Sequence, residues 1–357
     1  MESNGFNPAW WLPHGHLQTV WGRQTRPKQL VPFHREILET PDGDELILDH
    51  LAEAPNTRHP APDTGGGSRH SPHAILLHGL EGSSYSVYMQ GLMSLMAARG
   101  WQASAVNFRS CARDPRNILR MLPNRRPRMY HSGETSDFDF VVRTLRSRDP
   151  ARPLVAVGVS LGGNALLKWL GEHPDQTDVA AAATISVPYD LARGSRHLET
   201  PIGRFYLANF LRTLRPKAIA AAERFPEAAA RIDVERVRRS TTFYEYDDAA
   251  TGPLHGFAGA DDYYSRCSSL GFVGRIRTPA LCVSSEDDPF LPREVLPEVK
   301  AAASPAVELV ITRAGGHTGF TTGPWPWKPH FWAEELVVSW LAERLNHQDT
   351  KTPRKTC

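Results

Sequence analysis

The chain has 357 residues, which is enough for one large α/β domain with an insertion or for two average domains. Its composition, with 41% hydrophobic and 22% charged residues, is ordinary for a globular enzyme. The net charge of +2 is too small to indicate nucleic acid or an anionic membrane surface as a partner. The sequence shows neither a signal-peptide pattern nor a run of about twenty apolar residues, so we expect no transmembrane segment and a cytoplasmic location.

The spacing of cysteines and histidines gives no sign of a metal site. The four cysteines lie far apart and form no C-x-x-C pair, so they predict neither a disulfide framework nor zinc ligands. They are Cys111, Cys267, Cys282 and Cys357. His14 and His16 are close together, but no further ligands follow them at zinc spacing. We expect no metal and no cofactor.

The N-terminal part of the chain is expected to pack on the main domain and to lead into a hairpin. Residues 1–32 form this N-terminal segment, and residues 33–51 hold two strand-like runs joined by an Asp-Gly turn, which is a strong hairpin signal. Two later stretches are expected to be surface loops. These are the Pro-, Gly- and Ser-rich residues 54–73 and the arginine-rich residues 113–131, for which a solvated loop is favoured over an anion site.

From residue 73 onward, short apolar runs alternate with helical patterns. Continuous apolar strands that are separated by helices predict a mostly parallel central sheet with helices on both faces, and hence an α/β fold. The strand-like runs are residues 74–78, 103–108, 154–159, 180–187, 280–285 and 307–312.

The alternation stops between residues 189 and 277, where Leu207, Leu211 and Leu214 have helical spacing and no core strand is evident. We expect this stretch to be a helical lid inserted over the carboxyl ends of the strands, where open α/β sheets bind ligands. The other expected parts are residues 33–188 and 278–346 for the two halves of the core, and residues 347–357 for a flexible tail.

A candidate nucleophile lies in the G-x-S-x-G pattern of residues 158–162. The pattern follows an apolar run and precedes a helical one, and this strand–turn–helix context is what a nucleophile elbow requires. The helix would direct the backbone N–H of Leu161 at the reacting centre. We therefore expect Ser160 to be a nucleophile rather than part of a glycine-rich packing turn.

A serine hydroxyl needs a base, and the base needs an acid that orients it. His317 follows the last predicted strand and is placed to reach Ser160. Three consecutive acids follow the run at residues 280–285, and adjacent side chains of an extended chain point to opposite sides. Asp288 is expected to be the acid because the proline that follows it makes a rigid exit turn. Asp287 is expected to bond to loop backbone instead.

Two backbone N–H groups are expected to form an oxyanion hole, which stabilises negative charge on a carbonyl oxygen. One belongs to Leu161, directly after the serine. The second is expected from Leu80 in "LLHGLEGSS", because Gly79 bends the chain after the first core strand. His78 is more typical of a structural turn residue than of a base.

These motifs resemble those of the AB hydrolase 4 family of the α/β-hydrolase superfamily, the YheT-like hydrolases. The resemblance spans residues 6–345 and includes "NPAWWLPHGHLQTVWG", "HGLEGSSYSVY", "NFRSC", "YHSGETSDF", "GVSLGGNALLKWLGE", "FYEYDD", "GFAGADDYY", "EDDPFLP" and "GGHTGF". It implies a serine hydrolase of carboxylic esters with Ser160, Asp288 and His317 as the triad. Relatives act on acylglycerols, phospholipids or medium-chain acyl esters, and membrane-anchored relatives have an N-terminal hydrophobic span that is not seen here. The chain departs from the family pattern at "CARDPRN", which leaves substrate preference open.

We expect a carboxylesterase or lipase-like enzyme that cleaves small-molecule acyl esters, with short to medium acyl chains, through an acyl-enzyme. The alternative is an acyltransferase that passes the acyl group to an alcohol. A non-catalytic binding protein is less favoured, because such proteins usually lose a triad member. Trp10, Trp11 and Trp21 are expected to pack against the domain rather than to line an acyl pocket. The oligomeric state is left open.

Overall fold

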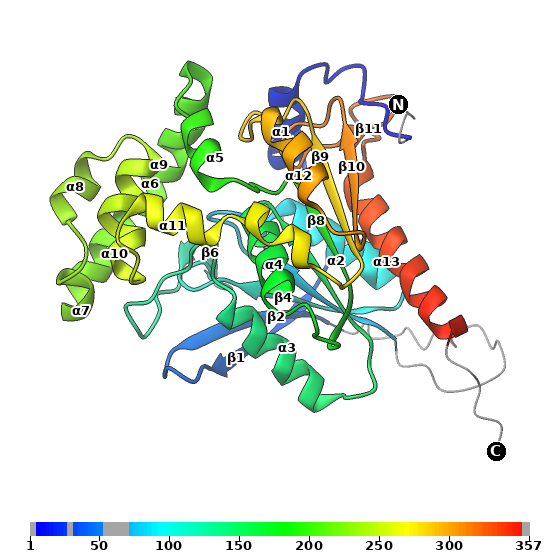
Figure 1. Ribbon diagram of the computed structural model, residues 1–357, viewed down its shortest axis with the longest axis horizontal. Coiled ribbons are helices and arrows are strands. Elements are labelled where there is room, and N and C mark those ends of the chain that lie inside the picture. Colours follow the sequence, from blue (N-terminus) through cyan, green and yellow to red (C-terminus); the bar gives the residue numbers. More distant parts are fainter. Residues whose placement is uncertain (1–4, 27–30, 53–70, 352–357) are drawn as a thin grey trace.

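The computed structural model describes residues 5–26, 31–52 and 71–351 of the chain. Most of the predicted surface loop at residues 54–73 lies outside the described residues, as do the end of the predicted tail and Cys357. The described part forms an eight-stranded sheet, helices that cover it, and a further group of helices to one side (Figure 1).

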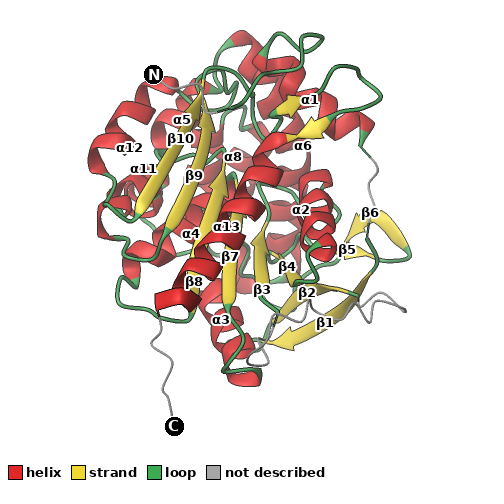
Figure 2. Ribbon diagram, turned by 90° about the vertical axis from the view of Figure 1, so that its right-hand side faces the viewer, coloured by secondary structure: helices red, strands yellow, loops and turns green. Residues whose placement is uncertain are grey.

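The central sheet has the strand order β1-β2-β4-β3-β7-β8-β9-β10 and is parallel except at β2, which is antiparallel to both of its neighbours. Figure 2 shows the sheet with β10 at the left and β1 at the right. The mostly parallel α/β architecture predicted from the alternating pattern is confirmed, as is the hairpin of the first two strands. The strands are β1 (Phe33–Glu39), β2 (Glu45–Leu51), β3 (His73–Leu77), β4 (Gln102–Asn107), β7 (Leu154–Val159), β8 (Val179–Ile185), β9 (Ala280–Ser285) and β10 (Val307–Thr312).

Helices cover both faces of the sheet because successive strand residues point in opposite directions. In β7, Val155 and Val157 belong to a buried cluster with α2 and α13, whereas Leu154 and Ala156 belong to a cluster with α3, α4 and α12. Helix α13 crosses in front of the sheet in Figure 2. Continuous apolar strands are stable only when both faces are covered in this way. These helices are α2 (Val87–Ala98), α3 (Ser136–Arg148), α4 (Leu161–Glu172), α12 (Leu296–Ala302) and α13 (Trp332–Lys351).

The chain between β8 and β9 folds into a separate group of helices, several of which lie at the left of Figure 1. This group has a buried core of its own, in which the predicted leucine face of α6 packs against Tyr246 and Ala250. The helices are α5 (Leu191–His197), α6 (Pro201–Arg224), α7 (Pro226–Ala229), α8 (Val234–Arg239), α9 (Phe243–Tyr246), a π-helical turn (Asp247–Thr251), α10 (Gly252–Leu254) and α11 (Ala260–Cys267).

Many residues of the arginine-rich stretch at 113–131 are exposed, as expected of a solvated segment, but the stretch is not only a loop. It contains a short antiparallel hairpin of β5 (Arg113–Asp114) and β6 (Asn117–Met121). Arg128 is bonded to Glu134 at 2.5 Å, so at least this cation is neutralised within the chain. The hairpin was not predicted because strands this short carry too little alternation to be recognised. A second two-stranded sheet, of β11 (Thr321–Thr322) and β12 (His330–Phe331), escaped prediction for the same reason.

No helix in the described part of the chain is both long enough and apolar enough to cross a membrane. Within the same residues, no group of three or more His, Cys, Asp and Glu side chains is arranged to hold a metal ion. Cys111, Cys267 and Cys282 are buried free thiols, and burial raises the pKa of Cys111 to about 11.

Candidate active site

Ser160 lies in a sharp turn between the end of β7 and the start of α4. Its backbone has a φ of +54° and a ψ of −120°, a strained combination for a residue with a side chain. Glycines make the turn possible, because a Cβ on Gly158 would lie 2.5 Å from the carbonyl oxygen of Gly162, and one on Gly162 would lie 2.5 Å from that of Leu77. The N–H of Ser160 donates to the carbonyl of Ile185 at 2.8 Å, which ties the turn to β8. The serine therefore stands at the carboxyl edge of the sheet.

The structure brings Ser160, His317 and Asp288 together from the segments that follow β7, β10 and β9. Ser160 Oγ lies 2.9 Å from His317 Nε2, and Asp288 Oδ2 lies 2.8 Å from His317 Nδ1. If Nδ1 carries the ring proton and donates it to the carboxylate, Nε2 is free to accept from the hydroxyl. His317 and Asp288 are 7% and 4% exposed, so water competes little for these contacts. Chemically, such an arrangement can activate a serine hydroxyl.

Asp288 and its neighbour Asp287 have different partners, as the alternation of side chains predicts. Asp288 Oδ1 accepts the backbone N–H of Phe290 at 2.8 Å, which leaves Oδ2 for the histidine. The ring of Phe290 stacks on His317 with the centroids 4.4 Å apart. Asp287 Oδ1 accepts the backbone N–H of Gly316 at 2.8 Å, and burial raises the pKa of this carboxyl. Asp287 therefore ties the acid loop to the loop that carries the histidine.

The residues expected to supply the oxyanion hole, Leu80 and Leu161, both line the cavity at Ser160. The turn before Leu80 is held by Gly79, whose N–H donates to the hydroxyl of Tyr88 at 2.9 Å. A Cβ on Gly79 would lie only 3.1 Å from the Cβ of Ser160, so the turn approaches the serine closely. The two leucines are thus near the hydroxyl, and the direction of their N–H groups toward a substrate stays a prediction.

Several residues that the sequence singled out serve in packing. His78 is fully buried, and its Nε2 accepts a hydrogen bond of 3.1 Å from the backbone N–H of Phe108, directly after β4. It is therefore a structural residue. The rings of Trp11 and Trp21 meet edge to face at 5.0 Å, and Trp10 packs on Trp325 at 5.9 Å. None of these side chains is among the described residues that line the cavity at Ser160.

Helix α1 (Gly15–Thr25) contacts the loops that carry both partners of Ser160, a role that the sequence reasoning missed. Thr19 Oγ1 accepts the backbone N–H of His317 at 2.8 Å and donates to the carbonyl of Gly15 at 2.7 Å. The Gln18 side chain accepts the N–H of Thr321 at 2.7 Å and donates to its carbonyl at 3.1 Å. A Cβ on Gly15 would lie 2.0 Å from the carbonyl oxygen of Asp287, so glycine permits this close approach. The motif "PHGHLQT" was visible in the sequence, but its partners were not.

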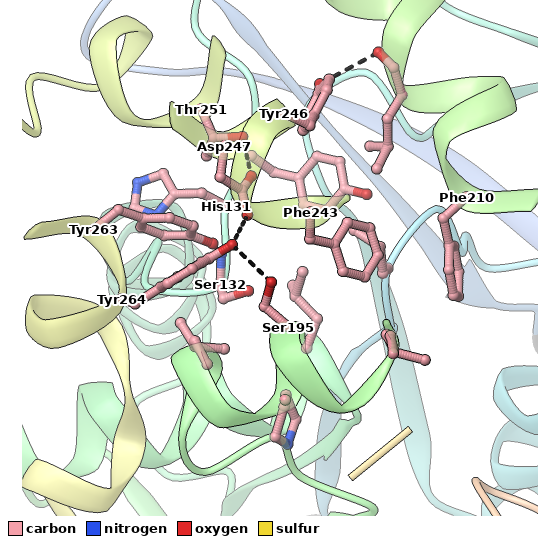
Figure 3. A pocket seen from close by; sticks show the side chains of 18 of the residues that line it. His131, Ser132, Ser195, Phe210, Phe243, Tyr246, Asp247, Thr251, Tyr263 and Tyr264 are labelled. Carbon is pink, nitrogen blue, oxygen red and sulfur yellow. Dashed lines mark hydrogen bonds between the residues drawn. The ribbon is translucent and has the colours of Figure 1, made fainter. Parts of the chain in front are cut away.

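A largely apolar cavity of about 1010 Å³, including its part open to solvent, extends from Ser160 beneath the inserted helices. Figure 3 shows part of its wall, with the rings of Phe210 and Phe243 and a polar group around Asp247 and Tyr264. The sequence reasoning missed this polar group, because "FYEYDD" and "GADDYY" could be recognised only as motifs of a family. Apolar walls next to a reactive hydroxyl can hold a hydrocarbon chain.

This arrangement is that of an α/β hydrolase. The serine stands in a strained strand-to-helix turn, and the histidine and the buried acid follow two later strands of a mostly parallel sheet. The chain belongs to the α/β-hydrolase family, whose sequence model, described as alpha/beta hydrolase fold, matches residues 72–324, and within it to the group that contains the YheT and ABHD proteins. The family predicted from the motifs is therefore confirmed.

Two relatives and one solved structure illustrate the match. The chain is 33% identical over 344 residues to the YheT protein of Escherichia coli (strain K12), which carries the name esterase, and the match covers 96% of this chain and 95% of that one. It is 30% identical over 321 residues to phospholipase ABHD3 of Homo sapiens, and this match covers 90% of the present chain and 75% of the human one. The structure of the Pyrococcus furiosus esterase Pf2001, at 14% identity, covers 97% of this chain and 99% of that one with a TM-score of 0.53, which shows the fold. The predicted class of enzyme, a carboxylic ester hydrolase, agrees with the names of the relatives.

Proposed function

We propose that the protein hydrolyses carboxylic esters through a covalent acyl-enzyme on Ser160, with His317 as the base and Asp288 as the acid that orients it. The observation that carries this proposal is the pair of contacts, 2.9 Å and 2.8 Å long, that joins the three side chains at the cavity. A serine hydroxyl attacks well only if a base takes its proton, and a buried carboxylate stabilises the imidazolium that results. The names esterase and phospholipase of the relatives support the same class of reaction.

In the first step, Ser160 Oγ attacks the ester carbonyl while its proton passes to Nε2 of His317. The N–H groups of Leu80 and Leu161 stabilise the negative charge that develops on the carbonyl oxygen, and the start of α4 adds the positive end of its helix dipole. The intermediate collapses, the alcohol leaves with the proton from His317, and the acyl group stays on the serine. Water then attacks the acyl-enzyme with help from the same base and releases the acid.

The cavity supports short- to medium-chain acyl esters as the substrates. Phe210, Leu214 and Phe243 of the inserted helices contribute apolar wall. Each methylene group transferred from water into such a site contributes about 0.8 kcal/mol, so kcat/KM should rise with chain length until the cavity is filled. In this proposal residues 189–277 act as the lid, residues 33–188 and 278–346 form the catalytic core, and residues 1–32 pack on that core.

The test uses p-nitrophenyl esters of increasing chain length and a fluorophosphonate probe. Ser160→Ala should lose both hydrolysis and labelling, with turnover reduced on the order of 10⁴- to 10⁶-fold. Ser132→Ala is the matched control, because Ser132 is another serine of the cavity wall, and it should keep the labelling. Turnover at the wild-type level in folded Ser160→Ala would contradict the proposal.

Product analysis with an added alcohol separates hydrolysis from acyl transfer, since the two share the acyl-enzyme and differ in the acceptor. Free carboxylic acid as the main product supports hydrolysis. A new ester of the added alcohol as the main product would make the enzyme an acyltransferase, and a folded wild type that neither turns over esters nor reacts with the probe would make it a binding protein.

A further inference from the structure

The inserted helices place a carboxyl group, that of Asp247, on the wall of the cavity that contains Ser160. Asp247 begins a π-helical turn that ends at Thr251, and such turns are frequent at functional sites. Figure 3 shows its side chain beside Tyr264, with Ser195 on the other side of the tyrosine hydroxyl. The chemistry proposed for Ser160 uses a different acid, so it leaves Asp247 without a role.

Asp247 is held by two hydroxyl groups that leave part of the carboxyl available. Thr251 Oγ1 donates to Oδ1 at 2.6 Å, and the Tyr264 hydroxyl donates to Oδ2 at 2.7 Å. The same tyrosine hydroxyl lies 3.4 Å from Ser195 Oγ. A carboxylate has about four lone-pair positions, and two of them are used here. Because Asp247 lines the cavity, a bound molecule can reach the others.

The largely apolar surroundings of Asp247 make the burial of its carboxyl group energetically unfavourable. Among the described residues that line the cavity, Asp247 is the only acid, and none is Lys or Arg. Burial raises the pKa of Asp247 to about 6. A buried carboxyl without a counter-ion is unfavourable unless hydrogen bonds compensate for the lost water. Packing of the lid alone would be served as well by an uncharged side chain, and the carboxyl therefore points to a ligand group.

We propose that Asp247, Tyr264 and Ser195 form a polar subsite that binds a hydroxyl group of the ester substrate. The inference rests on the proposed ester hydrolysis at Ser160, since both places border one cavity. A substrate hydroxyl can donate to the carboxyl group of Asp247 and accept from the hydroxyl of Ser195. The apolar part of the substrate fills the rest of the cavity, and the hydroxyl sets how far the molecule enters.

A neutral hydroxyl group fits this subsite better than an ammonium group does. The partners of Asp247 in the network, Thr251 and Tyr264, are hydroxyls, and a further hydroxyl joins them without bringing a net charge. An ammonium group would give up its water on entering an apolar cavity, and it would need several acceptors in exchange. One carboxyl that is already bonded twice supplies too few of them.

The test measures the ratio of kcat/KM for an ester with an added hydroxyl to kcat/KM for the same ester without it. In the acyl arm, p-nitrophenyl octanoate is compared with derivatives that are hydroxylated at successive carbons from the middle to the end of the chain. In the alcohol arm, propyl octanoate is compared with its 2-hydroxypropyl and 3-hydroxypropyl counterparts. The wild type should prefer the hydroxylated ester in one of the two arms, and that arm identifies which end of the substrate reaches Asp247.

Asp247→Leu should lower this ratio by about 10- to 100-fold, the effect of losing a hydrogen bond to a charged group. Asp247→Asn keeps one acceptor oxygen and should lower the ratio less. Asp248→Asn is the matched control, because Asp248 is bonded to Arg236 at 2.7 Å and to the N–H of Ala260 at 3.1 Å and is not among the cavity-lining residues. A purely structural role of Asp247 would lower kcat/KM for both esters alike and leave their ratio unchanged.

Three results overturn the subsite while leaving ester hydrolysis in place. The first is a wild type whose octanoate cleavage depends on Ser160 but which prefers the hydroxylated ester in neither arm. The second is an unchanged ratio of kcat/KM values in folded Asp247→Leu. The third is a stronger preference for an ammonium group than for a hydroxyl group at the same position. If Asp247→Leu does not fold, the subsite is tested by the wild-type ratio of kcat/KM values and by its decrease in Asp247→Asn. A wild type that cleaves no ester contradicts the proposed function and, with it, a subsite for its substrate.

Discussion

The inserted helices and helix α1 both reach the candidate active site from outside the sheet, but they contribute different things to it. The inserted helices supply the wall of the cavity, including Phe210 and Leu214. No described residue of α1 lines the cavity, and the helix instead bonds through Thr19 to the backbone of His317. We infer that the inserted helices would select the substrate and that α1 would position the reacting groups, which places the two tasks in different segments.

The two regions meet in one stack of side chains. His16 Nδ1 of α1 lies 3.0 Å from the hydroxyl of Tyr206 on α6. The ring of Tyr206 packs on Phe290 with the centroids 4.7 Å apart, and Phe290 stacks on His317. Substitutions in this stack should therefore change both substrate selection and kcat. Substitutions elsewhere in the inserted helices should change substrate selection alone, and those elsewhere in α1 should change kcat alone.

After Ser160 itself, the largest effect is expected at the pair of acids beneath α1. Asp288→Asn should lower kcat by about 10⁴-fold, because an amide no longer holds the histidine in the required tautomer. Asp287→Asn is the matched control and should cost far less, because its side-chain oxygen can still accept the N–H of Gly316. The measurement is kcat for p-nitrophenyl octanoate in both folded variants. The reverse order of the two would assign the acid to Asp287.

A second prediction concerns pH and separates the inserted helices from the rest of the molecule. Burial raises the pKa of Asp247 from 3.8 to about 6, so between these values the folded state keeps a proton that the unfolded chain has lost. The stability that this group contributes is full below about pH 4 and is lost as the pH rises through 6. From pH 4 to pH 7, the free energy of unfolding of the wild type should fall by roughly 2 kcal/mol relative to that of Asp247→Asn.

Urea unfolding across this pH range measures the difference, with Asp248→Asn as the control of opposite sign. The hydrogen bond from Arg236 lowers the pKa of Asp248, so its contribution to stability is present at neutral pH and is lost as the pH falls through its lowered pKa. A wild type that gains stability relative to Asp247→Asn as the pH rises would show that the carboxyl of Asp247 is not buried as described.

A third prediction tests whether the inserted helices select the acyl chain. Phe210→Ala removes a ring from the cavity wall and should lower the octanoate-to-acetate ratio of kcat/KM by about 10-fold, because the longer chain loses apolar contact. Phe205→Ala is the control on the same helix, since Phe205 is 76% exposed. An unchanged ratio, with equal losses for both esters, would argue against this division of roles.

The smallest effect is expected from α1. Thr19→Val keeps the shape of the side chain but loses the acceptor for the N–H of His317, and kcat should fall by roughly 3- to 10-fold. The KM values for acetate and octanoate should both stay unchanged, because α1 does not border the cavity. Thr19→Ser should restore kcat, and Thr25→Val, at an exposed bond on the same helix, should have no effect. A change in chain-length preference in Thr19→Val would contradict the inference that α1 takes no part in selecting the substrate.

The class of fold and the position of the serine turn could be predicted from the sequence, because both depend on residues that are neighbours along the chain. Apolar runs of strand length predicted the parallel strands, and the glycines around Ser160 predicted a turn that only small residues allow. The divergence of Asp287 and Asp288 followed from the alternation of adjacent side chains. Each of these features is a local property that a short window of residues contains.

The distant residues that support the serine, the histidine and the acid could be identified only in the folded chain. Thr19 and His317 are 298 positions apart, and no periodicity or motif connects them. The polar group around Asp247 likewise forms only when helices α5 and α11 and the π-helical turn pack together. A hydrogen bond between such residues forms only when whole segments pack together. That packing is set by the sum of many weak contacts, so no single stretch of the sequence predicts it.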